Sequence, residues 1–140
     1  LPTLASPEAA HDFVFVDDVV SAFVLAAERP ASEPGAVFNV GSGVQTTLAE
    51  VVATARRVLA IDVEPEWGTM TSRSWDTGVW IADSRRIRTE LGWEPTVDFE
   101  AGFRKQVEWF RANPSLWPLY EAIAARRSSG RLRSAGASKG

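Results

Sequence analysis

Apolar residues along the chain alternate between short runs and helical spacing, and this pattern predicts an α/β fold. The first unit joins an apolar run at 13–16, typical of a strand, to a helical pattern that ends near Glu28. Asp17 and Asp18 stand at the junction, where either can cap the helix by accepting free N–H groups. The spacing predicts an inward apolar face made of Val19, Val20, Phe23, Val24 and Ala27.

A second unit repeats the order of strand and helix. The run at 36–40 predicts a strand, and the glycine-rich residues 41–43 predict a turn from that strand into a helix. Thr47 and Glu50 have the spacing of a capping box, in which each side chain satisfies a backbone N–H group at the helix start. The helix should run to about Ala60. Its expected inward positions are Leu48, Val51, Val52, Ala55, Val58 and Leu59.

The segment after this helix is less regular. Residues 62–66 predict a short strand, and the stretch before Asp83 carries glycines, hydroxyl side chains and three tryptophans without a clear period. Asp83 is expected to cap a helix over 84–91. Gly92 should end that helix, because the position after a helix favours left-handed dihedral angles. We expect Trp93 to pack back on the same helix.

Two further helices are predicted beyond this point. Asp98 is expected to cap the first, over 99–111, and Asn113-Pro114 should break it because proline cannot continue a helix. The last helix is expected over 116–126. The inward positions of the first are Phe99, Phe103, Val107 and Phe110, and Trp109 also stands at a core-like position.

Composition narrows the possible functions. The chain has no cysteine, which excludes disulfides and thiolate chemistry, and its single histidine excludes a histidine-rich metal site, so no metal is predicted. All 18 acidic residues precede residue 126, whereas five of the 15 basic residues lie in 126–140. An acidic body argues against nucleic acid as a partner. No apolar run reaches membrane-spanning length, so we expect no membrane partner and a cytoplasmic location.

Four segments then stand in a recognisable order. They are DFVFVDDVVSA at 12–22, FNVGSG at 38–43, RSWDTGVWIADSRRI at 73–87 and ELGWEP at 90–95, with VEWFR at 107–111 after them. Together they resemble the C-terminal part of the extended short-chain dehydrogenase/reductase family. Within that family they are most similar to the NAD-dependent nucleotide-sugar epimerases and dehydratases. The resemblance covers about residues 11–112.

The resemblance implies an α/β fold, the substrate-binding portion of a Rossmann-type enzyme with few short strands and flanking helices. We expect an entry loop at 1–10, this portion at 11–125 and a basic, disordered tail at 126–140. The family's glycine-rich phosphate loop is not found, because the glycines at 41–43 lack the further glycine of a dinucleotide fingerprint. Its Tyr-x-x-x-Lys pair is not found either, because the one tyrosine, Tyr120, is followed four residues later by Ala124. We therefore expect no catalytic or cofactor-binding residue here, and no turnover by this chain alone.

Three residues are candidate substrate contacts through the resemblance. Arg73 stands ten residues before Asp83, as does the family's arginine that contacts the substrate diphosphate, and a guanidinium fork suits paired phosphate oxygens. Asp76 matches a position that accepts ribose hydroxyls; a turn-forming aspartate is the alternative. His11 replaces an arginine found in many relatives, which gives either a weaker phosphate contact or a structural residue.

Trp75 and Trp80 are candidate pocket-lining residues. An indole face can stack on a nucleobase or a sugar ring. The alternative, favoured for Trp80 beside Val79 and Ile81, is an apolar lid over the site.

These residues together predict the nucleotide-diphosphate-sugar-binding portion of an epimerase or dehydratase, with isomerase, oxidoreductase or lyase chemistry in the complete enzyme. NAD or NADP would be held by a missing Rossmann half, supplied in cis or in trans, and the complete enzyme is expected to be a homodimer. One alternative is a non-catalytic module that binds sugar nucleotides or a partner. Another is a piece of a longer gene product.

Overall fold

The computed structural model describes residues 4–29, 33–68 and 80–125. The chain divides into two compact units, Leu1–Phe103 and Arg104–Gly140. None of the helices in the described ranges is both long and apolar enough to cross a bilayer. The first unit carries the residues that concern function.

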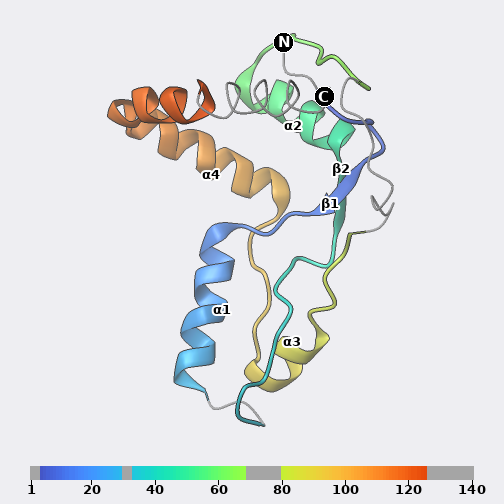
Figure 1. Ribbon diagram of the computed structural model, residues 1–140, viewed down its shortest axis with the longest axis vertical. Coiled ribbons are helices and arrows are strands. Elements are labelled where there is room, and N and C mark those ends of the chain that lie inside the picture. Colours follow the sequence, from blue (N-terminus) through green and yellow to red (C-terminus); the bar gives the residue numbers. More distant parts are fainter. Residues whose placement is uncertain (1–3, 30–32, 69–79, 126–140) are drawn as a thin grey trace, which may run out of the picture. The chain divides into compact units, whose positions relative to one another are not determined.

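The first unit combines a small sheet with helices (Figure 1). Its elements are β1 (Ala10–Asp12), α1 (Val16–Glu28), β2 (Gln45–Thr47), α2 (Leu48–Leu59), α3 (Arg85–Leu91) and the start of α4 (Phe99–Ala112). Strands β1 and β2 pair antiparallel, with His11 opposite Thr46. The extended segments 36–40 and 93–98 run lengthwise beside α1 (Figure 1).

The first strand lies earlier than the sequence predicted. The prediction of a strand at 13–16 is wrong, because β1 covers Ala10–Asp12 and α1 already begins at Val16. The apolar side chains in between are used for packing instead of strand pairing. The ring of Phe13 lies 5.2 Å from that of Phe99. Phe15 packs so closely on Gly102 that a Cβ there would lie 2.9 Å from Phe15 Cδ2.

Neither aspartate at the start of α1 is its N-cap. The N-cap is Phe15, which makes no side-chain capping bond, so the expected cap by Asp17 or Asp18 is wrong. Both carboxylates lie in the first turn, where their negative charge interacts favourably with the positive end of the helix dipole. The Asp18 side chain is buried and accepts hydrogen bonds from the N–H groups of Thr96 and Val97 at 3.0 and 3.1 Å. It therefore attaches α1 to the segment before α4.

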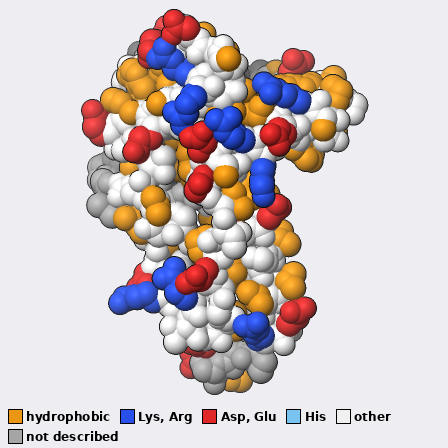
Figure 2. Space-filling model, turned by 180° about the vertical axis from the view of Figure 1, so that it is seen from behind, with side chains coloured by type: hydrophobic (Ala, Val, Ile, Leu, Met, Phe, Trp, Pro, Cys, Tyr) orange, Lys and Arg blue, Asp and Glu red, His pale blue; other side chains and the backbone are white. Residues whose placement is uncertain are grey.

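The apolar face predicted to point inward is instead largely at the surface. The prediction is wrong for Val20, Phe23, Val24 and Ala27, whose side chains are exposed. We define the α1 stripe as Val16, Val20, Phe23 and Val24; Phe23 is 74% exposed. Figure 2 shows hydrophobic side chains at the surface along the flank formed by α1. The opposite side of the helix, through Ala22 and Leu25, faces the core.

The core of the first unit joins α1 to α3. It consists of Ala22, Ile87, Leu91 and Trp93, with Val14, Leu25, Phe38 and Val40 packed against it. The indole N–H of Trp93 donates to the Asp18 carbonyl at 2.9 Å. Gly92 ends α3 with a φ of 69°, as predicted. Because Trp93 packs in one cluster with Ile87 and Leu91 of α3, its expected packing on this helix is confirmed.

Two predicted strands do not form ladders in the described part of the chain. Residues 36–40 are extended, with Phe38 and Val40 toward the core and Val37 exposed, but no backbone hydrogen bond joins 37–40 to another described segment. The turn at 41–43 leads to β2 and only then to α2. In the predicted strand at 62–66, only Glu66 makes a bridge, through its carbonyl and the N–H of Leu4 at 2.9 Å.

The helix ends follow local signals in most cases. The capping box of Thr47 and Glu50 is confirmed, and α2 ends at Leu59. Asp98 Oδ1 accepts the N–H of Ala101 at 2.7 Å, as expected of a cap for α4. The predicted inward positions of α2 and α4 are at best half-buried, and Leu59 is exposed.

The cap of α3 differs from the prediction. Its N-cap is Ser84 and not Asp83. The Ser84 hydroxyl is used elsewhere, because it donates to the carbonyl of Gly41 at 3.1 Å. The Asp83 carboxylate accepts the N–H of Arg85, the first residue of the helix, at 3.1 Å.

The second unit contains the rest of α4, a 3₁₀ turn at Pro114–Leu116 and helical residues 117–125. The break at Asn113-Pro114 is confirmed. Phe110 lies at the centre of an aromatic cluster whose ring centroids lie 5.1–5.4 Å from its own; the other members are Trp109, Trp117 and Tyr120. Trp109 is 43% exposed, so its expected place in a core is wrong.

Candidate functional site

Two of the five predicted site residues lie together in the first unit. His11, on β1, and Trp80 are 69 positions apart in sequence, yet their ring centroids are 6.4 Å apart with a tilt of 44°. His11 is exposed and Trp80 is 51% exposed. The other three, Arg73, Asp76 and Trp75, lie outside the described residues.

Two further aromatic rings extend this pair into a row. The ring of Phe13 stands edge-on to that of His11 at 6.1 Å, and it contacts Phe99 at 5.2 Å. We call His11, Phe13, Trp80 and Phe99 the aromatic row. Exposed aromatic faces can stack on planar or sugar rings, and an imidazole N–H can donate to an anionic oxygen.

Sequence reasoning missed Phe13 and Phe99 as site residues. The apolar pattern marked Phe13 as part of a strand and Phe99 as an inward helical position, which are structural roles. Only the tertiary contact of Phe13, which follows β1, with the start of α4 places Phe99 in the row. The sequence offers one signal for Phe13. It follows His11 by two positions, which puts both side chains on the same side of an extended chain.

Asp12, the residue after His11, accepts four hydrogen bonds from two distant segments. Oδ1 receives the N–H and the hydroxyl of Ser42, at 2.8 and 2.5 Å. Oδ2 receives the N–H groups of Gly43 and Ala82, both at 3.0 Å. Partial burial favours the neutral carboxyl, but these bonds together favour the anion more and hold the pKa of Asp12 below its ordinary value.

The glycine-rich turn at 41–43 is therefore already bound to an anion of the protein itself. Backbone N–H groups at such turns can cradle a phosphate. Here the N–H groups of Ser42 and Gly43 both donate to the Asp12 carboxylate. These residues do not fit the pyrophosphate of a dinucleotide cofactor, because their donors are already taken.

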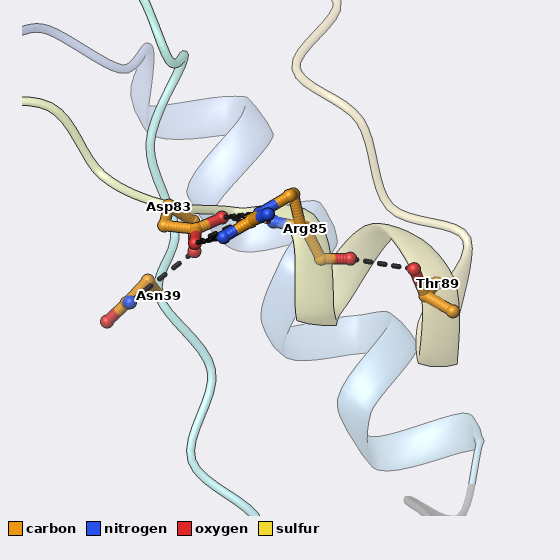
Figure 3. Close-up of polar contacts among 4 residues, drawn as sticks. All are labelled: Asn39, Asp83, Arg85 and Thr89. Atoms are coloured by element: carbon orange, nitrogen blue, oxygen red, sulfur yellow. Dashed lines mark hydrogen bonds and ion pairs between the residues drawn. The ribbon is translucent and has the colours of Figure 1, made fainter.

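A second polar cluster lies at the start of α3 (Figure 3). The Arg85 guanidinium donates to both oxygens of Asp83, at 2.6–3.1 Å. These hydrogen bonds lower the pKa of Asp83 to about 2. The Asn39 amide donates to the Asp83 carbonyl at 3.4 Å, and the Thr89 hydroxyl to the Arg85 carbonyl at 2.9 Å. The cluster fixes the helix start, and its carboxylate is not poised to accept a proton near neutral pH.

An apolar groove lies between α1 and the extended residues 36–40. It has a volume of about 170 Å³ and is lined by Ala22, Phe23, Ala26, Phe38, Val40 and Ile87. No titratable side chain lines it. A groove of this composition suits packing against apolar side chains better than recognition of a charged ligand.

Known proteins resemble this chain in sequence and in fold. The family model described as GDP-mannose 4,6 dehydratase matches residues 2–106. The UDP-glucose 4-epimerase of Mycolicibacterium smegmatis is 42% identical over 101 residues, which cover 72% of this chain and 31% of that protein. The structure of Thermotoga maritima UDP-glucose 4-epimerase with UDP-glucose is 34% identical with a TM-score of 0.69, covering 80% of this chain and 35% of that one.

A third relative is the Bordetella bronchiseptica enzyme WbmF, solved in complex with NAD⁺ and UDP. It is 28% identical with a TM-score of 0.66, and the match covers 89% of this chain and 35% of that chain. The chain thus belongs to the GDP-mannose 4,6-dehydratase family, among the extended short-chain dehydrogenase/reductase epimerases and dehydratases of nucleotide sugars. It spans about a third of the length of the relatives it matches.

Proposed function

We propose that this chain is the nucleotide-diphosphate-sugar-binding portion of an NAD(P)-dependent epimerase or dehydratase. The observation that carries the proposal is the contact between His11 and Trp80, two residues singled out from sequence that meet at an exposed surface. Family membership supports it, as does the UDP-glucose in the structure of the Thermotoga maritima relative.

Each candidate residue has a role in this proposal. Arg73 binds the diphosphate through its guanidinium, and Asp76 accepts the ribose hydroxyls. His11 donates to a phosphate oxygen, while Trp75 and Trp80 line the pocket for the base or the sugar. These roles follow from the resemblance and from ordinary chemistry.

A nucleotide-binding half completes the enzyme, in cis or in trans, and would hold NAD or NADP and the catalytic tyrosine and lysine. Two surface features support such a partner. The α1 stripe is apolar and exposed, and residues 37–40 have backbone groups that pair with no strand in the described ranges. Both border the apolar groove, so a partner sheet seated here would bury the stripe and supply hydrogen bonds to the extended residues 37–40.

Binding of UDP-glucose to the chain tests the proposal. We expect Arg73→Ala to weaken binding by about 1.5–3 kcal/mol, the usual contribution of a hydrogen bond to a charged group, in isothermal titration calorimetry. Arg111→Ala is the matched control, because it removes the same charge from α4. Equal affinities of the two variants would remove Arg73 from the site.

The same assay separates the enzyme from the non-catalytic alternative. The part of the Mycolicibacterium smegmatis epimerase that this chain does not match is added together with NAD. Turnover of UDP-glucose in the mixture supports the enzyme portion. Tight binding without turnover supports a binding module.

A further inference from the structure

One carboxylate connects the two segments that carry His11 and Trp80. Asp12 directly follows His11 at the end of β1, and Ala82 lies two residues after Trp80. The N–H of Ala82 donates to Asp12 Oδ2 at 3.0 Å. The same oxygen accepts the N–H of Gly43, also at 3.0 Å. Asp12 Oδ2 therefore attaches both residues 80–82 and the turn to the end of β1.

The packing around this carboxylate leaves little room for another arrangement. A Cβ at position 41 would lie 2.4 Å from Ala82 Cβ and 2.7 Å from Asp12 Oδ2, so only glycine permits this close approach. The buried Ser84 hydroxyl also fixes Gly41, because it accepts the Gly41 N–H at 3.2 Å and donates to the Gly41 carbonyl at 3.1 Å. The turn, β1 and residues 80–82 thus meet at one point.

We propose that Asp12 is a positioning residue of the candidate site, whose carboxylate sets the position of Trp80 relative to His11. Both rings are attached to the backbone within two residues of the atoms that Asp12 joins. Loss of the carboxylate would release residues 80–82 while the β1–β2 pairing keeps His11 in place. The consequence for ligand binding rests on the proposed function, whereas the ring geometry does not.

Asp12→Ala tests the proposal, with Asp18→Ala as the matched control. Asp18 also accepts hydrogen bonds from a distant segment, through Thr96 and Val97, and it bonds to neither ring. The first readout is the nuclear Overhauser effect between the His11 imidazole and Trp80 indole protons without ligand. The second is the Kd for UDP-glucose.

We expect Asp12→Ala to abolish the Overhauser effect. It should also weaken UDP-glucose binding about tenfold, which corresponds to the loss of about one hydrogen bond between the site and a charged group of the ligand. Asp18→Ala should lower the unfolding temperature but leave both readouts unchanged. Retention of the Overhauser effect in Asp12→Ala, or its loss in both variants, would overturn the proposal. A wild-type chain that fails to bind UDP-glucose contradicts the proposed function only, because the Overhauser effect is measured without nucleotide.

Hydrogen exchange in the wild-type chain decides the matter if Asp12→Ala does not fold. The Ala82 amide should exchange as slowly as the amides of Ser42 and Gly43, since all three donate to the same carboxylate. Exchange of the Ala82 amide at the rate of an unprotected amide would contradict the proposal.

Discussion

Three aspartates of the first unit show how the same side chain serves different purposes. Asp12 and Asp18 each accept backbone N–H groups from segments far along the chain, and each fixes a tertiary connection. Asp83 instead pairs with Arg85, two residues away, and stays at the surface. Local spacing suggested a helix cap for Asp18 and Asp83 alike. Burial separates them, because a buried carboxylate has to find donors wherever the fold supplies them.

The pairing of Asp83 with Arg85 predicts a measurable acid dependence. Because the folded pKa of Asp83 is lowered to about 2, the stabilisation is present above the ordinary pKa of 3.8 and is lost as the pH falls through about 2. Titration of carboxyl carbon shifts by NMR should give an Asp83 midpoint well below that of a free aspartate. Arg85→Gln should return the midpoint toward the ordinary value, whereas Arg86→Gln should not. An unshifted midpoint in the wild-type chain would show that the pair does not persist in solution.

At the scale of elements, the capping box of α2 gives a direct stability prediction. Thr47→Ala removes the hydroxyl that accepts the Glu50 N–H at 3.2 Å, and it should lower the free energy of unfolding by about 1 kcal/mol in urea denaturation. Thr46→Ala is the matched control, because Thr46 lies in the middle of β2 and caps no helix. A loss as large in the control would mean that the strand, and not the cap, carries the effect.

The elements that were predicted correctly are those fixed by neighbouring residues. The capping box at Thr47, the left-handed Gly92 and the break at Pro114 each depend on a few consecutive positions. The strand β1 was placed too late because its partner β2 is more than 30 residues away and carries no strong apolar signal. In the site, the family resemblance pointed to His11 and residue type to Trp80, but Phe99 and the Asp12 connections depend on tertiary contacts that no local pattern encodes.

The wrong orientation of α1 has a different cause and belongs to the scale of the whole molecule. Its sequence has two apolar sides, one made of Ala22 and Leu25 and the other being the α1 stripe. Periodicity identifies such faces but does not say which one the rest of the chain covers. Sequence alone could therefore not tell which side of α1 this chain would bury.

Exposure of the α1 stripe predicts the behaviour of the isolated chain. Replacement of Val20 and Phe23 together by lysine should reduce binding of a hydrophobic fluorescent dye and reduce self-association in analytical ultracentrifugation. The free energy of unfolding should change by no more than about 0.5 kcal/mol, as for other surface changes. Leu25→Lys, on the core side of the same helix, should instead destabilise the chain strongly. Undiminished dye binding in the double variant would show that the dye binds to an apolar surface other than the α1 stripe.

The attachment of α1 through Asp18 also has a consequence for synthesis on the ribosome. The acceptor is made before its donors at Thr96 and Val97, which follow 78 and 79 positions later. Translation delivers residues from the N-terminal side first. The connection of the helix to the segment before α4 must therefore wait until these later residues have left the exit tunnel. During that interval the helix is an obvious target for chaperones.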